Sequence, residues 1–311
     1  MQNTKNIMRH PITDTQTGIR RNMLKKSLIS QIRRLSFALL LMAGFLFLYP
    51  NTQVHASTVG SYKSKNESIT VYKKTYNKVT YYAAHVQLKN YKNMYLAKAN
   101  KKRSNGFQYV SSIAKANHAI LAVNGPFNGA NSKHWDAFGG KKYYKISNHN
   151  FYEIVKGTYY KGKTGGTTAD EMASYSNKTG ILAPACEQKG VTSGMTLKTA
   201  AAKKLISDTF QGDTACTLLK NGKIQVAKGG DKRQRTFIGT NGKAGDIWIV
   251  VCNGSKTKGL NAYQEAAILK KLGCSYGYNL FGAGNTTMIF KGKKLNNNPQ
   301  RKGYDALVVG K

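Results

Sequence analysis

The last third of the chain alternates short apolar runs with turn-forming residues, and this pattern predicts strands around one helix. Three runs rich in apolar and β-branched residues are typical of strands. A helix-periodic segment separates the second run from the third. A strand, a crossover helix and a second strand form the unit that makes parallel pairs. The predicted strands are Thr236–Thr240, Asp246–Cys252 and Ser275–Leu280, and the predicted helix is Asn261–Leu272.

This helix carries a start signal and a stop signal. Asn261 can cap the first turn, Gln264 stands three residues later as in a capping box, and Gly273 follows the last apolar position. Apolar residues at helical spacing predict that one stripe faces a sheet, with Glu265 near the edge of the stripe. A glycine-rich elbow, Phe281–Asn285, follows the third strand, at a position where open α/β sheets tend to bind ligands.

The preceding residues predict a strand meander and then a helix. Runs rich in Tyr, Val and Thr favour strands. Apolar residues at helical spacing predict a helix at Gly106–Ala116, and the buried strand Ala119–Val123 follows and ends in a turn-forming cluster. The strands of the meander are Ile69–Tyr72, Lys78–Leu88 and Met94–Ala97.

The middle of the chain is less regular. Residues 130–180 predict a long irregular segment, which in a compact domain is usually a functional loop or a disordered insertion. An Asn-Gly pair at 221–222 between two apolar runs predicts a hairpin with a type I′ turn. The complete pattern predicts an α/β (mixed α+β) fold, with a central mixed sheet, packed helices and an N-terminal strand meander. The other expected elements are strands at Tyr152–Val155, Ile181–Cys186, Thr287–Phe290 and Asp305–Val309 and a helix at Thr196–Phe210.

The amino terminus predicts export. Four basic residues precede an apolar run from Leu35 to Tyr49, and a small-residue cleavage pattern ends at Ala56. The run is shorter than the ~20 residues that a membrane span needs. We therefore expect residues 1–56 to be a secretory signal peptide, with Met23 as an alternative start and 1–22 as an upstream extension. Residues 57–311 are expected to form one secreted or cell-wall-associated domain with no stable membrane span.

The charge of the chain predicts an anionic partner. Lys and Arg outnumber Asp and Glu by 49 to 13, a formal net charge of +36. Removal of residues 1–56 takes away eight basic side chains and Asp14 and leaves a net charge of about +29. Such a surplus fits nucleic acid, a membrane surface or an acidic polymer, and it also fits a solvated surface suited to an acidic cell envelope.

All four cysteines lie in the part that we expect to be exported, where disulfides are permitted and three pairings are open. Cys252 ends one predicted strand and Cys274 precedes another, so these two could lie close together. The spacing of Cys and His fits no zinc motif, so no metal site is expected, and the cofactor stays unassigned. The other two cysteines are Cys186 and Cys216.

Four motifs in a fixed order resemble those of the phosphodiester glycosidase family. Residues 122–127 (AVNGPF), 235–239 (RTFIG), 250–254 (VVCNG) and 279–288 (NLFGAGNTTM) are similar to the family patterns NGGFF, RTAIG, VVDG and NLDGGGSSTM. The likeness covers a core of about residues 107–311. It implies hydrolysis of a sugar-phosphate diester, because the best-known member removes N-acetylglucosamine from a sugar-1-phosphate diester.

The resemblance implies a phosphodiester site at the ends of several strands. Arg235 can bind a phosphate bidentately. Gly282 and Gly284 let backbone N–H groups approach an anionic oxygen, and Thr286 and Thr287 add hydroxyl donors. Asparagines at strand ends could orient sugar hydroxyls, although these asparagines and glycines could also serve only turns. The remaining expected substrate-binding residues are Asn124, Gly125, Asn253 and Asn279.

Two substitutions remove the acids of the family motifs. Phe281 stands where the glycine-rich motif has Asp, and Asn253 stands where VVDG has Asp. Glycoside cleavage usually needs a carboxyl pair. We therefore expect proton transfer by Asp136 together with His134 in the irregular segment, or by Asp231, which could instead pair with a neighbouring basic residue.

Three functions remain open at this stage. The favoured one is a secreted hydrolase that acts on a sugar-phosphate diester in an anionic cell-envelope polysaccharide. The alternative is an inactive relative that retains the anion-binding cleft and binds anionic cell-wall polymer. Nucleic-acid binding is less favoured, because nothing resembles a nucleic-acid module or a nuclease metal cluster.

Overall fold

The computed structural model describes residues 57–99, 108–126, 153–160, 172–210, 217–255, 257–280 and 282–311. All of them belong to one compact unit, residues 54–311. Within these ranges no helix is both long enough and apolar enough to span a membrane. The expected signal peptide, His134, Asp136, Cys216 and Phe281 lie outside the described residues.

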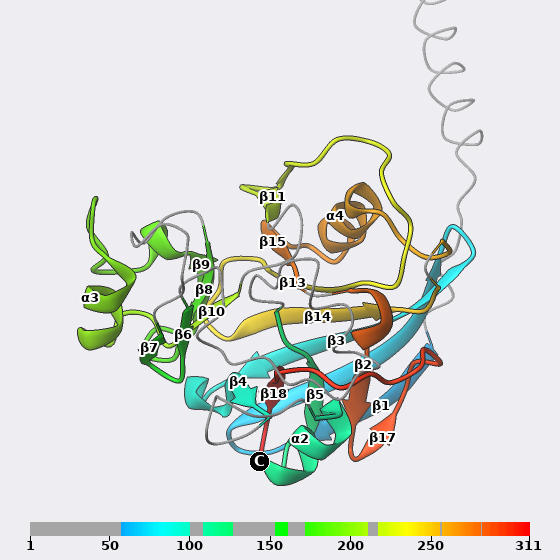
Figure 1. Ribbon diagram of the computed structural model, residues 1–311, viewed down its shortest axis with the longest axis horizontal. Coiled ribbons are helices and arrows are strands. Elements are labelled where there is room, and N and C mark those ends of the chain that lie inside the picture. The colour runs from blue at the N-terminus through cyan, green and yellow to red at the C-terminus, as the bar shows by residue number, and fades with distance from the viewer. Residues whose placement is uncertain are drawn as a thin grey trace, which may run out of the picture. The chain divides into compact units, whose positions relative to one another are not determined.

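The larger sheet has eight strands in the order β1-β2-β3-β14-β13-β15-β11-β12 (Figure 1). The predicted N-terminal meander is correct for its first two strands, which form the antiparallel pair β2 and β3, but the third predicted strand, Met94–Ala97, belongs to the second sheet, and β1 occupies the edge beside β2 instead. The expected bounds of β13 and β14 are confirmed residue for residue. The strands are β1 (Ser57–Lys63), β2 (Glu67–Tyr76), β3 (Val79–Leu88), β11 (Thr217–Lys220), β12 (Lys223–Ile224), β13 (Thr236–Thr240), β14 (Asp246–Cys252) and β15 (Tyr276–Asn279).

The expected parallel pair around the crossover helix is wrong. Helix α4 (Ala262–Lys271) connects β14 to β15, but β13 lies between these two strands and pairs antiparallel with both. Gly239 of β13 therefore faces Trp248 on one side and Gly277 on the other. All pairings among the described strands of this sheet are antiparallel, so the expected mixed sheet is wrong. Antiparallel sheets with separate helices are typical of an α+β fold. The apolar pattern of β13 indicates a strand, but it does not reveal that the strand has a neighbour on each side.

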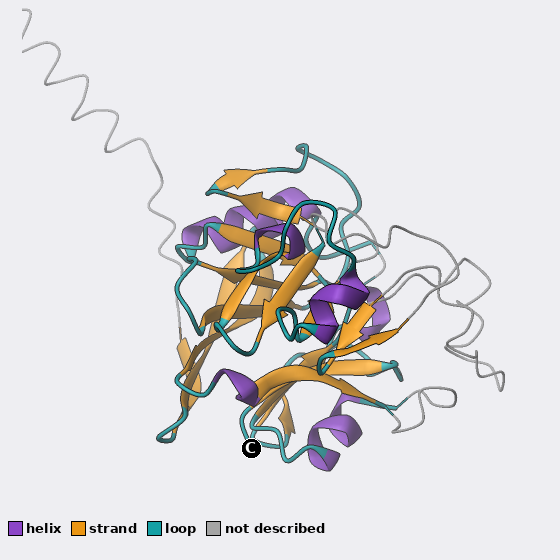
Figure 2. Ribbon diagram, turned by 90° about the vertical axis from the view of Figure 1, so that its left-hand side faces the viewer, coloured by secondary structure: helices purple, strands orange, loops and turns teal. Residues whose placement is uncertain are grey.

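A second sheet has five strands in the order β17-β16-β5-β18-β4. Its inner face and the inner face of the larger sheet form the main hydrophobic core, through residues such as Val86, Leu96, Val123 and Ile249. Helix α2 (Val110–Ala116) packs on the opposite face of this sheet, and α4 packs on the opposite face of the larger one (Figure 2). The strands are β4 (Met94–Lys98), β5 (Leu121–Asn124), β16 (Met288–Phe290), β17 (Lys293–Lys294) and β18 (Asp305–Val309).

A smaller region carries the remaining described elements. Its helix α3 (Leu197–Ala202) is much shorter than the predicted helix Thr196–Phe210, because Lys204 has a left-handed φ of 56° and the last residues form β10. The Asp208 carboxylate accepts hydrogen bonds from the backbone N–H groups of Leu96 and Lys156, tertiary contacts that hold β10 in place. The strands are β6 (Glu153–Val155), β7 (Thr158–Tyr160), β8 (Ala173–Ser176), β9 (Ile181–Pro184) and β10 (Asp208–Phe210), and the short 3-10 turns are η1 (Tyr91–Asn93), η4 (Ala185–Glu187) and η5 (Ala283–Asn285).

Two local predictions are confirmed. Asn261 and Gln264 form the capping box at the start of α4, with hydrogen bonds of 2.9 and 3.1 Å. Asn221 and Gly222 both have positive φ, 52° and 71°, as a type I′ turn requires.

Cys252 and Cys274 are buried free thiols and are not bonded to each other. They lie toward opposite ends of β13. The Cys252 sulfur accepts a hydrogen bond from the backbone N–H of Arg235, before the strand begins, whereas a Cβ on Gly239 would lie 2.9 Å from the Cys274 sulfur.

Candidate functional site

Arg235 lies immediately before β13 and is only 7% exposed. Its backbone is fixed by the end of β14, because its carbonyl accepts a 2.9 Å hydrogen bond from the N–H of Cys252. Its Nε donates to the carbonyl of Leu260 at 3.2 Å, and one terminal nitrogen, Nη2, donates to the carbonyl of Asp231 at 3.0 Å. Within the described residues Nη1 makes no hydrogen bond, so this nitrogen can serve an anionic oxygen.

Glu265 is the buried carboxyl beside this arginine. Its Oε1 lies 3.3 Å from Arg235 Nε, and the side chain is completely buried on α4. Burial raises the pKa of Glu265 to about 8, although the charge of Arg235 acts in the opposite direction. In the sequence, Glu265 is expected only near the edge of an apolar stripe. Its position beside Ala266 in that stripe is a sequence signal of burial. A buried carboxyl needs a cationic or hydrogen-bonding partner, so the signal also predicts a partner such as Arg235.

The glycine-rich elbow packs directly on Arg235, as the sequence predicts. A Cβ on the buried Gly282 would lie 2.6 Å from the carbonyl oxygen of Gln234 and 3.3 Å from Arg235 Cδ. A Cβ on Gly284 would overlap the guanidinium of Arg301, which the sequence analysis did not single out. The absence of side chains at these two glycines therefore allows an arginine to lie against each of them.

Two fully buried hydroxyls follow the elbow. Thr286 and Thr287 have no exposed surface, and neither Oγ1 has a hydrogen-bond partner among the described residues. Their backbone is held by Asn296, whose side chain donates to the carbonyl of Thr286 and accepts from the N–H of Met288, both at 2.8 Å. Buried hydroxyls without a protein partner are rare in native structures, so these two are candidate hydrogen-bond donors to a bound group.

Asn124 braces the site from the second sheet. Its Oδ1 accepts hydrogen bonds from Thr236 Oγ1 at 2.6 Å and from the backbone N–H of Thr287 at 3.1 Å. It thus ties the end of β5 to the start of β13 and to the segment that follows the elbow. Asn279 lies at the end of β15, opposite Phe237, and is 1% exposed.

Gly125 makes room for the side chain of Asp305, which the sequence predicts only as the first residue of a strand. A Cβ on Gly125 would overlap the carboxyl group of Asp305. The other carboxylate oxygen of Asp305 lies 3.5 Å from Lys98 Nζ, and both side chains are largely buried. Lys98 ends β4 and Asp305 begins β18, so the antiparallel register places them opposite each other. That register is a tertiary fact with no local sequence signal.

Two expected site residues have other contacts. The Oδ1 of Asn253 accepts a long hydrogen bond of 3.4 Å from the backbone N–H of Asn297. The side chain of Asp231 is 78% exposed and pairs with Arg233 at 2.5 Å, and only the carbonyl of Asp231 contacts Arg235. Proton transfer by Asp231 stays a prediction, as do the roles of His134 and Asp136, which lie outside the described residues.

No three His, Cys, Asp or Glu side chains of the described ranges gather closely enough to hold a metal ion. Cys252, whose sulfur accepts a hydrogen bond from the backbone N–H of Arg235, is a poor nucleophile, because burial raises its pKa to about 12. The charged and polar groups at this site are therefore suited to binding an anion through Arg235, Arg301 and the amide and hydroxyl groups of the elbow.

Solved structures and one family model are similar to this chain. The zebrafish N-acetylglucosamine-1-phosphodiester alpha-N-acetylglucosaminidase catalytic domain, auto-inhibited by its pro-peptide, has a similar fold, with a TM-score of 0.56 and 17% identity over 82% of this chain and 88% of that chain. A hypothetical protein from Synechocystis matches with a TM-score of 0.50 and 13% identity over 82% of this chain and 63% of that chain. No curated protein sequence matches this chain. The family model described as phosphodiester glycosidase matches residues 117–309, more than half of the chain, and the chain therefore belongs to the phosphodiester glycosidase family.

Proposed function

We propose that this chain is a secreted hydrolase that cleaves a sugar-phosphate diester in an anionic cell-envelope polysaccharide. The observation that carries the proposal is the contact between Gly282 and Arg235, which places bare backbone and a guanidinium at the same strand ends. A phosphodiester has one negative charge and two non-bridging oxygens, which suit a planar guanidinium together with backbone and hydroxyl donors.

The proposed binding mode places the phosphate among the arginines and threonines that surround the elbow. Arg235 Nη1 and the guanidinium of Arg301 hold the phosphate, and the hydroxyls of Thr286 and Thr287 donate to its oxygens. Asn124 and Glu265 act on these groups rather than on the substrate, because Asn124 holds the backbone of Thr287 and Glu265 lies against Arg235.

The leaving group reduces the demand on a general acid. When the bond between the sugar carbon and the phosphate oxygen breaks, a phosphate monoester departs, and its second pKa is about 6. Such a group leaves without full protonation when cations stabilise the developing charge. The neutral residues Phe281 and Asn253 are thus compatible with cleavage in which Arg235 and Arg301 supply most of the stabilisation and Asp136, His134 or Asp231 handles the proton of water.

The polymer and the compartment follow from charge and from the amino terminus. The strong basic surplus, which remains near +29 without residues 1–56, attracts a polyanion. The export signal expected at residues 1–56 would bring the domain to the cell envelope, where sugar-phosphate polymers are the fitting substrate class. Neither feature depends on the geometry of the site.

The test compares Arg235 with an exposed lysine beyond the other end of β13, in the full chain. Arg235→Ala should abolish release of sugar or phosphomonoester from a panel of sugar-1-phosphate diesters. Lys243→Ala is the control, because this exposed lysine lies in the turn after β13, at the end of the strand away from Arg235, and its loss should leave turnover within about twofold. A folded wild-type chain without turnover on the whole panel would contradict the hydrolase assignment.

A second candidate function is binding without cleavage, and Asn253 favours it. This residue replaces a family aspartate, and its amide oxygen accepts a hydrogen bond from the backbone of Asn297. A binding protein would retain anionic cell-wall polymer at low salt and lose it steeply as salt rises, because screening weakens charge attraction. Polymer retention without any product, in wild type and not in Arg235→Ala, would favour this function over hydrolysis.

A further inference from the structure

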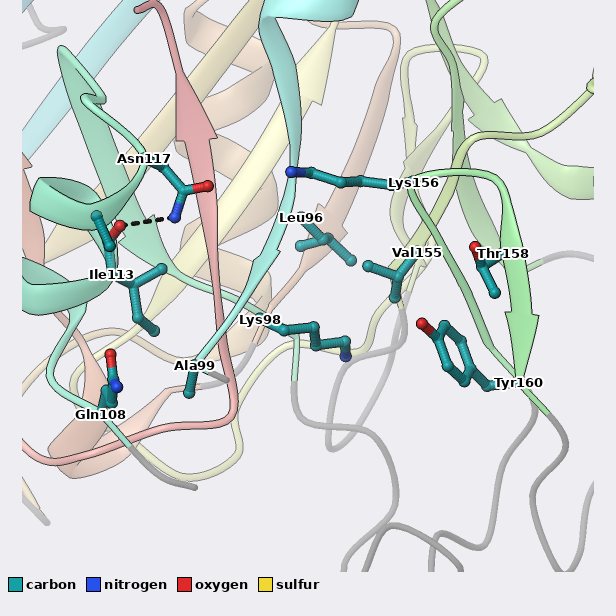
Figure 3. Close-up of a pocket in the computed structure, with 11 residues that line it drawn as sticks. Leu96, Lys98, Ala99, Gln108, Ile113, Asn117, Val155, Lys156, Thr158 and Tyr160 are labelled. Carbon is teal, nitrogen blue, oxygen red and sulfur yellow. Dashed lines mark hydrogen bonds between the residues drawn. The ribbon is translucent and has the colours of Figure 1, made fainter. Parts of the chain in front are cut away.

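A cavity of about 540 Å³ lies between α2, β4 and the β6–β7 hairpin (Figure 3). Its volume falls within the range of small-molecule sites. Two lysines cross it from opposite sides: Lys98 extends from β4 toward Tyr160, and Lys156 extends from the hairpin toward Asn117. Between them lies an apolar floor that includes Leu96 and Val155. A pocket with two cations and an apolar floor is suited to an anionic sugar derivative.

Three lysines and two acids lie around the cavity. Lys98 is paired with Asp305, whereas the ammonium of Lys156 lies over the ring of Tyr95 at 3.7 Å. The buried Asp208 accepts hydrogen bonds from the backbone N–H groups of Leu96 and Lys156 and from the side chain of Ser207. Burial lowers the pKa of Lys156, the charge of Asp208 raises it and the charge of Lys311 lowers it, so a third cation lies nearby. An anion beside the Lys156 ammonium would be attracted by both Lys156 and Lys311.

Two structural links join this cavity to the arginine site. Lys98, on the cavity wall, pairs with the Asp305 carboxylate that lies against Gly125. Gln108, also on the wall, exchanges two backbone hydrogen bonds with Gly303, at 2.8 and 3.0 Å. A Cβ on Gly303 would lie 3.8 Å from the side chain of Asn285 in η5. The first residue of β18 and the segment before it therefore contact both the cavity wall and the surroundings of the arginine site.

We infer that the cavity lined by Lys98 and Lys156 binds a further phosphate group of a polymeric substrate whose scissile diester lies at Arg235. This inference rests on the proposed function, because the repeating phosphate identifies the ligand. A sugar-phosphate chain carries one charge per repeat, so a second cationic pocket beside the first gives preference for a polymer over a single diester.

The kinetic test compares a small sugar-1-phosphate diester with an oligomer of three or more phosphodiester repeats. Lys156→Ala should raise KM for the oligomer about tenfold, in line with loss of one charge-assisted hydrogen bond. It should leave kcat for the oligomer, and both kcat and KM for the small diester, unchanged. Lys156→Arg should restore the oligomer KM. Lys115→Ala removes an equal charge from an exposed residue of α2 that does not line the cavity, and should leave the KM for both substrates unchanged.

Three results would overturn the inference. The first is that Lys156→Ala raises KM equally for both substrates, and the second is that it changes KM for neither. The third is that Lys115→Ala raises KM for the oligomer as much as Lys156→Ala does, which would indicate an effect of general surface charge. If wild type hydrolyses neither substrate, the proposed function fails separately. Calorimetric titration with inorganic tripolyphosphate then decides the cavity: about tenfold weaker binding in Lys156→Ala than in Lys115→Ala supports it, and equal affinities reject it.

Discussion

Glu265 lies 3.3 Å from Arg235, with its carboxyl group completely buried behind the guanidinium. The pair joins the first turn of α4 to the residue before β13, at the edge of the anion site. Because burial raises the pKa of Glu265 to about 8, this carboxyl is largely protonated near pH 7 and leaves the positive charge of Arg235 uncompensated. Above that pH its ionisation would neutralise the arginine that we propose to bind phosphate.

The first prediction concerns the pH dependence of stability. The pKa of Glu265 is raised from an ordinary value of 4.5 to about 8, so the folded chain holds a proton that the unfolded chain releases between these values. The contribution of Glu265 to stability is complete below pH 4.5 and is lost as the pH rises through 8. We therefore expect the unfolding free energy of Glu265→Gln to rise relative to that of wild type as the pH increases from 5 to 9. The change should be a few kcal/mol at most, measured by urea unfolding at each pH.

The same variant separates positioning from catalysis. If Glu265 acts only through Arg235, Glu265→Gln should abolish the loss of phosphodiester affinity above pH 8 and should change kcat at pH 6 less than about threefold. A fall of kcat by two orders of magnitude at pH 6 would instead make the carboxyl a proton donor in the reaction.

The second prediction concerns Gly282. Its substitution by alanine would place a methyl group 2.6 Å from the carbonyl of Gln234 and 3.3 Å from Arg235 Cδ, so the elbow or the arginine must shift. Since a displacement of about 1 Å can lower a rate about a hundredfold, Gly282→Ala should lose most of its turnover. Gly303→Ala is the control, because its methyl group would meet nothing closer than 3.8 Å. Equal activities of the two variants would contradict the role of the Gly282 contact.

The third prediction concerns Asp208, which holds β4 and the β6–β7 hairpin together. Its Oδ1 accepts from the N–H of Leu96 at 3.1 Å and of Lys156 at 3.0 Å. Asp208→Ala leaves these two donors without an acceptor and should destabilise the fold by about 3 kcal/mol in urea unfolding. Asp208→Asn retains an acceptor oxygen and should lose less than half as much. Similar losses for both variants would show that charge, not the acceptor, is the stabilising feature.

The sequence predicts those parts of the fold that depend on local signals. The bounds of β13, β14 and β18 and the capping box of Asn261 follow from periodicity and from the chemistry of a helix start. The insertion of β13 between β14 and β15 depends on pairing across the sheet, and the early end of α3 depends on the contacts of Asp208. Such long-range interactions leave no trace in local periodicity.

The candidate site divides in the same way. The motif glycines and Arg235 were identified from the sequence, and their contact in the structure agrees with the expectation. Glu265, Arg301 and the Lys98–Asp305 pair were missed, because each is brought to the site by an element distant in the chain. Glu265 alone had a local signal, since a carboxyl between alanines on the buried stripe of a helix requires a partner.

The last prediction uses two buried threonines that differ in one respect. Thr287 Oγ1 has no hydrogen-bond partner among the described residues, whereas Thr236 Oγ1 donates to Asn124 at 2.6 Å. Replacement of an unsatisfied buried hydroxyl by a methyl group removes a desolvation penalty, so Thr287→Val should be neutral or should stabilise the folded chain by about 1 kcal/mol. Thr236→Val removes a made hydrogen bond and leaves part of Asn124 unsatisfied, so it should destabilise by about 1–2 kcal/mol. If Thr287 Oγ1 binds the phosphate, Thr287→Val should lower kcat/KM about tenfold while its unfolding free energy is retained or raised. A residue whose loss weakens activity without weakening the fold is serving the ligand, and loss of both together in Thr287→Val would instead assign its hydroxyl to the structure.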